Sequence, residues 1–340
     1  MNEVSIIGVD LAKQVIQVHG AAADGRALFR KKLTRPQFAK FMASQDPCVV
    51  TMEACGTAHY WGRELSRLGH EVRLIPPVYV KPFVKRHKND TADAEAVAEA
   101  AQRPSMRTVA VKSAEQQARS MLFRTRSLLV GQRTQLVNAF RGHLAEHGIV
   151  VGRGVGNVAR LAAMLEDAEV PALVKEMSEL YLAQIARIGE EIDALDRRIA
   201  ATAKASDDMR RLQTAPGIGP VCAMAIATFA PDMREFRSGR DFAAWLGLVP
   251  RQLSSGGRQK LGRTSKMGQR DIRRLLIAGA MSIVHWRGRD GGRPGSGLAR
   301  MLARKPRMLV AVALANKMAR MIWAMLVREE DYRDPAGTVC

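Results

Sequence analysis

Five short apolar runs lie within the first 75 residues, and their order limits the folds open to this chain. The first three follow one another closely, and Asp24-Gly25 marks a hairpin turn between the second and the third. Segments with a helical pattern precede the fourth and the fifth, at residues 35–43 and 57–68. Adjacent strands followed by strands separated by helices predict a mixed α/β sheet. The predicted strands cover residues 4–9, 15–21, 27–33, 48–52 and 71–75.

Acidic residues stand at the ends of two of these runs. Asp10 directly follows the first run, and Glu53 directly follows the fourth. Because strand ends in α/β sheets open onto a shared crevice, we expect the two carboxylates to lie close together. Asp90 and Asp93 are three residues apart at a predicted helix start, so they should share one face of that helix.

Four converging carboxylates would repel one another strongly without cations. Two divalent ions about 4 Å apart would turn them into a two-metal phosphodiester site, and Mg²⁺ suits such an all-oxygen ligand set. Each acid also has an ordinary explanation when it is taken alone: an aspartate after a strand is common, and Asp90 could be a helix N-cap. The combination of all four on a basic chain favours the metal site.

Positive charge is concentrated in one stretch. The chain has 53 Lys and Arg against 33 Asp and Glu, a net charge of +20. Residues 251–307 alone hold 15 basic and 2 acidic residues. A charged run is often only a solvated face, but at this density self-repulsion is costly without a polyanion. The stretch therefore favours contact with nucleic-acid phosphates.

The middle of the chain predicts two long helices. Residues 113–116 indicate a capping box at the start of the first, and Pro171 opens the second. Apolar residues recur along the second helix at spacings of three and four, the seam of a coiled coil. Two interpretations stay open: one arm of an intrachain helical hairpin, or an arm for dimerisation. The seam consists of Ile185, Ile188, Ile192, Leu195 and Ile199.

A glycine-rich segment opens the last third. Residues 212–223 fit the helix–hairpin–helix pattern hxGhGxxxA. In that pattern Gly217 and Gly219 would let backbone N–H groups at a helix N-terminus approach a DNA phosphate. The alternative is a turn between two helices that binds no ligand.

Ser254 and Ser255 begin a predicted glycine-rich loop that ends at Gly268. On chemical grounds such a loop is more simply a flexible phosphate-binding turn than a source of a nucleophile. No His or Asp partner is apparent for either serine, so a base would have to come from elsewhere. The basic residues around the two serines are Arg251, Arg258, Lys260, Arg263 and Lys266.

Two further helices are predicted at residues 271–286 and 307–328. The segment between them, residues 287–297, is low in apolar content and is expected to be mobile. The second helix is strongly apolar but contains Lys317 and Arg320, which favours a helix of a soluble protein over a membrane span. Four scattered cysteines exclude a disulfide framework, and no signal peptide is apparent, so we expect a reducing, cytoplasmic location. The cysteines are Cys48, Cys55, Cys222 and Cys340.

Taken together, these motifs resemble the DEDD transposases of bacterial insertion sequences, the insertion-sequence-110 family, which includes Piv-type DNA invertases. The resemblance covers nearly the whole chain, and its specificity comes from the order and spacing of the motifs. They are IGVD at 7–10, MEACGT at 52–57, KNDTADA at 88–94, PGIG at 216–219, WLGLVPR at 245–251 and SKMG at 265–268.

The resemblance implies three parts: an N-terminal domain of the RNase H and RuvC fold over residues 1–150, a linker and coiled coil over 151–205, and a mainly helical transposase domain over 206–330. Residues 331–340 form a tail. It implies that Asp10, Glu53, Asp90 and Asp93 are the family's metal-binding tetrad.

The resemblance also implies a catalytic serine that joins DNA through a covalent phosphodiester. That role maps onto Ser255, with Ser254 as the alternative, because the loop differs in length by about one residue from its relatives. Cys55 departs from the small hydroxyl residue expected there. A noncoding bridge RNA that pairs with donor and target DNA, and homo-oligomers with composite sites, belong to the same expectation.

The sequence thus predicts a metal-dependent, serine-using DNA transposase or recombinase of the bacterial cytoplasm, guided by RNA. Two other classes stay open: a RuvC-like Holliday-junction nuclease that uses carboxylates and water, and a non-catalytic nucleic-acid-binding scaffold. A Piv-like invertase would share the chemistry with a different arrangement of sites.

Overall fold

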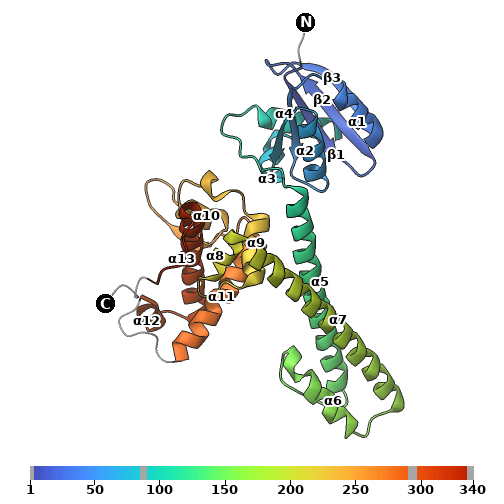
Figure 1. The fold of residues 1–340 in the computed structure, drawn as a ribbon, viewed down its shortest axis with the longest axis vertical. Helices are drawn as coiled ribbons and strands as arrows, with labels where there is room; N and C mark the ends of the chain where they lie inside the picture. The colour runs from blue at the N-terminus through green and yellow to red at the C-terminus, as the bar shows by residue number, and fades with distance from the viewer. Residues whose placement is uncertain (1–3, 85–89, 290–296, 335–340) are drawn as a thin grey trace. The chain divides into compact units, whose positions relative to one another are not determined.

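The computed structural model describes residues 4–84, 90–289 and 297–334; the side chains of residues 90, 91 and 287–289 lie outside this description. The chain forms two compact units, Met1–Gln117 and Ala118–Cys340 (Figure 1). The first unit holds a sheet with helices, and the second consists mainly of helices. The domain boundaries that the sequence suggests after residues 150, 205 and 330 stay predictions.

A five-stranded sheet forms the centre of the first unit, in the order β3-β2-β1-β4-β5. The strands β1, β2 and β3 pair antiparallel, whereas β4 lies parallel to both β1 and β5. The predicted mixed α/β sheet is therefore confirmed. The strands are β1 (Ile6–Leu11), β2 (Val15–Ala21), β3 (Ala27–Thr34), β4 (Val49–Glu53) and β5 (Glu71–Ile75).

Helices cover both faces of this sheet. Alternate apolar residues of β1, Ile7 and Val9, belong to a core shared with α1 and α2. The other face is covered by α4, which approaches closely because Gly8 has no side chain: a Cβ there would lie 2.2 Å from the carbonyl oxygen of Ala94. The helices are α1 (Arg35–Ala43), α2 (Ala58–Arg67), α3 (Pro77–Val80) and α4 (Asp90–Ala101), with the 3₁₀ turn η1 (Lys81–Phe83).

Two long helices and a short one begin the second unit. The predicted capping box is present, since the Ser113 hydroxyl accepts the backbone N–H of Gln116 and the Gln116 side chain accepts that of Ser113. Within the chain, α7 packs against α5: the rings of Tyr181 and Phe140 stack with centroids 5.4 Å apart, and Ile185 joins the same core. The intrachain interpretation thus accounts for part of the seam. The elements are α5 (Ala114–Ala145), η2 (Val155–Asn157), α6 (Val158–Glu166) and α7 (Ala172–Ala205).

A second core is built around α9, which is buried on nearly all sides. α13 is long and apolar enough to cross a membrane by length and composition, yet residues such as Ala315 and Ile322 on its buried face belong to this core. Of the segment expected to be mobile, residues 290–296 lie outside the described residues. The helices are α8 (Asp207–Gln213), α9 (Pro220–Phe229), η3 (Met233–Glu235), α10 (Gly239–Trp245), α11 (Arg270–Arg289), α12 (Gly297–Leu302) and α13 (Arg307–Arg328).

The segment that fits the helix–hairpin–helix pattern forms α8, a tight turn and α9, with the apolar positions of the pattern buried. Gly217 has a φ of +77°, and a Cβ there would lie 2.9 Å from the carbonyl oxygen of Gly279 on α11. Gly217 is therefore required for helix packing, whatever it binds. By contrast, no described atom lies within 4 Å of a Cβ built on Gly219.

Candidate active site

Asp10 and Glu53 lie side by side at one end of the sheet. Asp10 is the last but one residue of β1, and Glu53 is the last residue of β4. In the parallel register Val9 lies beside Met52, so the next neighbours along the two strands are Asp10 and Glu53. Because alternate residues of a strand share a face, both side chains belong to the face that carries Gly8. The structure thus brings the two strand-end acids together.

Asp93 reaches the same place from α4. The close approach of Ala94 to Gly8 brings this part of the helix onto the face that holds the acids. Burial raises the pKa of the Glu53 carboxyl above its usual range, and the carboxylates of Asp10 and Asp93 raise it further. Because Asp10 and Asp93 both act on the carboxyl of Glu53, the three acids form one cluster.

Asp90, the fourth predicted acid, begins α4, but its side chain lies outside the described residues. In the described part of the chain, no three His, Cys, Asp or Glu side chains are placed to hold a metal ion on their own. The acids still suit a divalent cation such as Mg²⁺, because a cation would relieve the repulsion that raises the Glu53 pKa. Mg²⁺ is usually held by one or two carboxylates with waters and substrate phosphates rather than by an all-protein cage.

Cys55 stands beside these acids. Burial raises the pKa of its thiol, and the carboxylates of Glu53 and Asp10 raise it further. The thiol is therefore protonated and uncharged at neutral pH. In this respect it resembles the hydroxyl that the family pattern led us to expect.

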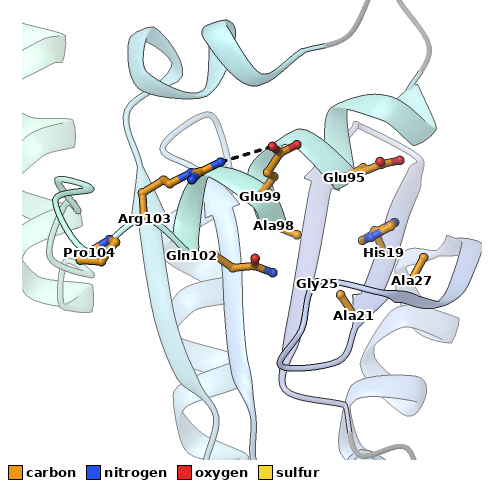
Figure 2. A pocket seen from close by; sticks show the side chains of 10 residues that line it. All are labelled: His19, Ala21, Gly25, Ala27, Glu95, Ala98, Glu99, Gln102, Arg103 and Pro104. Carbon is orange, nitrogen blue, oxygen red and sulfur yellow. Dashed lines mark ion pairs between the residues drawn. The ribbon is translucent and has the colours of Figure 1, made fainter.

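A cavity of about 460 Å³ lies on the same face of the sheet, beside α4 (Figure 2). None of the three clustered acids lines it. Its charged groups are paired: Glu95 lies 2.9 Å from the guanidinium of Arg30, and Glu99 lies 3.7 Å from that of Arg103. Because its charges are already balanced, this cavity is a poor site for a polyanion. Since none of the three acids lines it, the cavity is also separate from the acidic cluster.

The predicted loop from Ser254 to Gly268 is instead built on a β-hairpin of β6 (Pro250–Gln252) and β7 (Leu261–Thr264). A bridge between Ser255 and Arg258 continues the pairing toward the tip. Gly256 and Gly257 have φ values of 56° and 75°, which is the type I′ turn that two-residue hairpins favour. The prediction of a loop throughout residues 254–268 is wrong where β7 pairs with β6, because this turn imposes strand pairing on flanking residues that are too polar to signal strands.

The two serines differ in their hydrogen bonds. The hydroxyl of Ser254 accepts the backbone N–H of Lys260 at 3.1 Å and lies 3.5 Å from Oε1 of Gln252. The Ser255 hydroxyl has no hydrogen-bond partner among the described residues, and the residue is exposed at the tip of the hairpin. The Ser254 hydroxyl therefore helps to build the hairpin, whereas that of Ser255 is open to a substrate.

The predicted phosphate-binding cations are all exposed, and none forms an ion pair within the described residues. One of them has a hydrogen bond inside the hairpin region, since Arg251 donates to the carbonyl oxygen of Ser265 at 3.5 Å. The arrangement leaves their charges available to a polyanion. The residues are Arg251, Arg258, Lys260, Arg263 and Lys266.

Side chains from α11 and α13 hold the base of the hairpin. Arg273 Nη1 donates to the carbonyl oxygens of Leu246 at 2.8 Å and Met267 at 2.9 Å, one before and one after the hairpin. Asn316 Nδ2 donates to the carbonyl oxygen of Leu248 at 3.1 Å. Neither residue was predicted from the sequence, because a polar side chain on a helix carries no signal of a partner far away in the chain.

Two family models match the chain. Residues 7–149 match a DEDD transposase model of the IS110 type, described as "Transposase". Residues 209–292 match a model described as "Transposase IS116/IS110/IS902 family". The first match contains the acidic cluster, and the second contains the glycine turn and the serine hairpin.

Relatives match over almost their whole length. The chain is 48% identical over 334 residues to a probable family 20 transposase of Pseudomonas aeruginosa, covering 97% of this chain and 98% of the relative. It is 40% identical to the transposase of the element IS1328 of Yersinia enterocolitica, covering 96% and 97%, and 37% identical to that of IS1111A of Coxiella burnetii, covering 98% and 92%. The chain belongs to the IS110 family of transposases.

Membership of the IS110 family makes the chain an enzyme that cleaves DNA and transfers its strands. The family motifs also have structural reasons in this IS110 transposase. A Cβ on Gly247 would lie 2.0 Å from the carbonyl oxygen of Met267, and one on Gly268 would lie 1.7 Å from that of Trp245. These two glycines let the chain entering the hairpin and the chain leaving it pack against each other.

Proposed function

We propose that this transposase cuts and rejoins the DNA of a bacterial insertion sequence with a metal-dependent acidic tetrad and a serine nucleophile. The tetrad is Asp10, Glu53, Asp90 and Asp93, and the nucleophile is Ser255. The observation that carries the proposal is geometric: the strand register sets Asp10 beside Glu53 at the end of the sheet, on the face against which α4, the helix of Asp93, packs at Gly8. The pKa of Glu53, raised by burial and then by the carboxylates of Asp10 and Asp93, supports it. Carboxylates gathered against their own repulsion are typical of a site for divalent cations and phosphates.

The acids would hold Mg²⁺, with two ions in the two-metal form of the site. When bound, Mg²⁺ would polarise the phosphoryl group and favour the ionised forms of the attacking and leaving oxygens. Asp10 and Glu53 would supply ligands from rigid strands, which fixes the reacting phosphate relative to the sheet. Asp93 would supply a ligand from α4, and Gly8 supports that placement by letting the helix pack closely.

The Ser255 oxygen would attack the phosphorus of a DNA phosphodiester. A bond forms between Oγ and phosphorus as the bond from phosphorus to one strand-end oxygen breaks, and the serine proton passes to that departing oxygen. Attack by the hydroxyl of another strand end then reverses the step, restoring the serine and joining new partners. The cations of the hairpin would offset the charge that develops on the phosphoryl oxygens.

The proposal includes three partners: DNA of the element and the target, a noncoding guide RNA, and further copies of this chain. Hairpin cations without acidic partners in the described chain and the open Gly219 support contact with phosphates. Ile188 and Leu195 of the α7 seam stay only partly buried within the chain, which supports a role for α7 in assembly. The guide RNA rests on the family resemblance.

Replacing Asp10 by Asn tests the metal site. The substitution removes one negative charge at almost constant size, so we expect a folded protein whose Mg²⁺-dependent strand cleavage falls by at least about 100-fold. Cleavage of DNA from the flanks of the gene should be measured beside circular dichroism, with Asp24→Asn, an exposed turn acid of the same unit, as the control. A folded Asp10→Asn protein that cleaves like wild type would refute the proposal.

A further inference from the structure

The row of acids continues across the sheet toward its edge. The strand register places Gln17 beside Asp10 and Lys32 beside Gln17. Directly paired residues of neighbouring strands share a face, so one row contains Lys32, Gln17, Asp10 and Glu53 in that order. We propose that Lys32 and Gln17 bind the phosphodiester backbone of the DNA strand that enters the acidic site. This inference rests on the proposed function, because it takes the acids to mark the place of cleavage.

Lys32 differs from its neighbours on β3 in having no partner among the residues that the structure describes. It is exposed, and among the described residues it makes no ion pair or hydrogen bond. By contrast, Arg30 pairs with Glu95 at 2.9 Å, and Lys31 lies on the opposite face with Nζ 4.8 Å from the centroid of the Phe41 ring. Lys32 is therefore the cation of this strand that is left for an external anion.

Gln17 lies between Lys32 and Asp10, where an uncharged hydrogen-bond donor suits a bound phosphate better than a cation would. It is half-buried, and its side chain has no hydrogen-bond partner within the described chain. Its amide can donate to a phosphate oxygen without carrying charge. A cation at this position would instead pair with Asp10 and compete with a metal ion for the carboxylate.

Strand spacing sets where the bound phosphate lies. Neighbouring strands are about 4.8 Å apart, so the backbones of Lys32 and Asp10, two strands apart, are separated by about 10 Å. Successive nucleotides of one duplex strand rise by about 3.4 Å. The phosphate bound by Lys32 should thus lie within about three nucleotides of the one that is cleaved.

A different explanation for Lys32 is protection of the sheet edge. β3 is an edge strand, and lysines on such strands discourage pairing with other chains. Lys31 would serve that purpose equally well, since it is also exposed on the same strand. The two lysines therefore form a matched pair. If Lys32 binds a phosphate, replacing Lys32 and replacing Lys31 should have different effects on the affinity for DNA. If both lysines only protect the edge, the two replacements should have the same effect.

The test measures affinity for a short DNA duplex that spans the junction between the element and its flank, in EDTA, at about 50 to 200 mM salt. All proteins are full-length and carry Asp10→Asn, so cleavage cannot change the probe. Each phosphate that the protein no longer neutralises lowers the log–log salt slope by about 0.9, so between these salt concentrations the affinity of Lys32→Ala should fall about 3.5-fold less than that of its parent. Lys31→Ala should match the parent, and Gln17→Ala should weaken binding with little change in slope.

Single neutral methylphosphonates then locate the bound phosphate. A methylphosphonate at the phosphate that meets Lys32 should weaken binding of the parent protein and leave Lys32→Ala unaffected, within about three nucleotides of the cleavage position. Equal salt slopes for Lys32→Ala and Lys31→Ala, or identical interference patterns for parent and Lys32→Ala, would overturn the inference. Failure of the proposed function would show elsewhere, as cleavage by Asp10→Asn in Mg²⁺.

Discussion

At the scale of single residues, the two adjacent serines make the sharpest distinction in the molecule. The Ser254 hydroxyl accepts the Lys260 backbone N–H, whereas the Ser255 hydroxyl is exposed at the hairpin tip. An attacking serine leaves protein covalently joined to a DNA end, and a phosphate-binding serine does not. We therefore expect Ser255→Ala to abolish a protease-sensitive protein–DNA adduct, and Ser254→Ala to retain it at a level reduced by no more than about 10-fold, because one neutral hydrogen bond contributes about 1 kcal/mol.

The adduct is measured by denaturing the reaction on a nicked substrate and mapping the modified peptide by mass spectrometry. Ser255→Thr is a useful companion, because it keeps a hydroxyl in a more crowded form. An adduct that persists in Ser255→Ala and disappears in Ser254→Ala would move the nucleophile by one residue. Cleavage by wild type without any adduct would favour the hydrolytic, resolvase-like mechanism.

At the scale of elements, the turn at Gly217 packs so closely against α11 that there is no room for an added side-chain atom. A Cβ on Gly279 would lie 2.0 Å from the carbonyl oxygen of Gly217, and the atom it meets is backbone. Gly279→Ala should destabilise the protein by about 1–3 kcal/mol through overpacking. Gly131→Ala is the matched control: it also lies within a helix, α5, but no described atom is near its Cβ, so it should be neutral or stabilising by up to about 1 kcal/mol. Thermal unfolding followed by circular dichroism compares the two, and equal melting temperatures would contradict this account.

Some helices and strands could be predicted from the sequence, and others could not. The predicted bounds of β2, α1, β5 and α13 match the structure, because apolar periodicity and turn residues define both ends of each. β6 and β7 were not predicted, since they are three and four residues long and largely exposed, so no buried face imposes a pattern. The pairing of Gln17 with Lys32 depends on a register shift between Gly20 and Ala21 that the predicted hairpin does not reveal. Arg273 likewise required the tertiary structure.

At the scale of the whole molecule, net charge governs affinity for DNA. Most of the basic excess lies within residues 251–307, and the hairpin contributes several exposed cations that have no acidic partner in the described chain. Replacing Arg258, Lys260, Arg263 and Lys266 by Ala should lower the log–log salt slope of duplex binding by about 0.9 for each DNA phosphate that these side chains neutralise in the wild type.

A matched set of four exposed cations from residues 153–187 serves as the control for that measurement, because it removes the same net charge elsewhere. Fluorescence anisotropy over a salt series gives both slopes. Equal slopes for the two quadruple variants would place the phosphate footprint outside the hairpin. The control residues are Arg153, Arg160, Lys175 and Arg187.

The bridge that Arg273 makes between Leu246 and Met267 has a consequence for the length of the hairpin. Arg273 of α11 binds the chain on both sides of the hairpin that carries Ser254 and Ser255. The contacts between the hairpin's base and the helices therefore do not depend on the length of the hairpin. Residues can be inserted into or deleted from the hairpin without repacking the helices. Changes in the length of the hairpin would therefore alter the reach and register of Ser255 without requiring changes in the helices that support it.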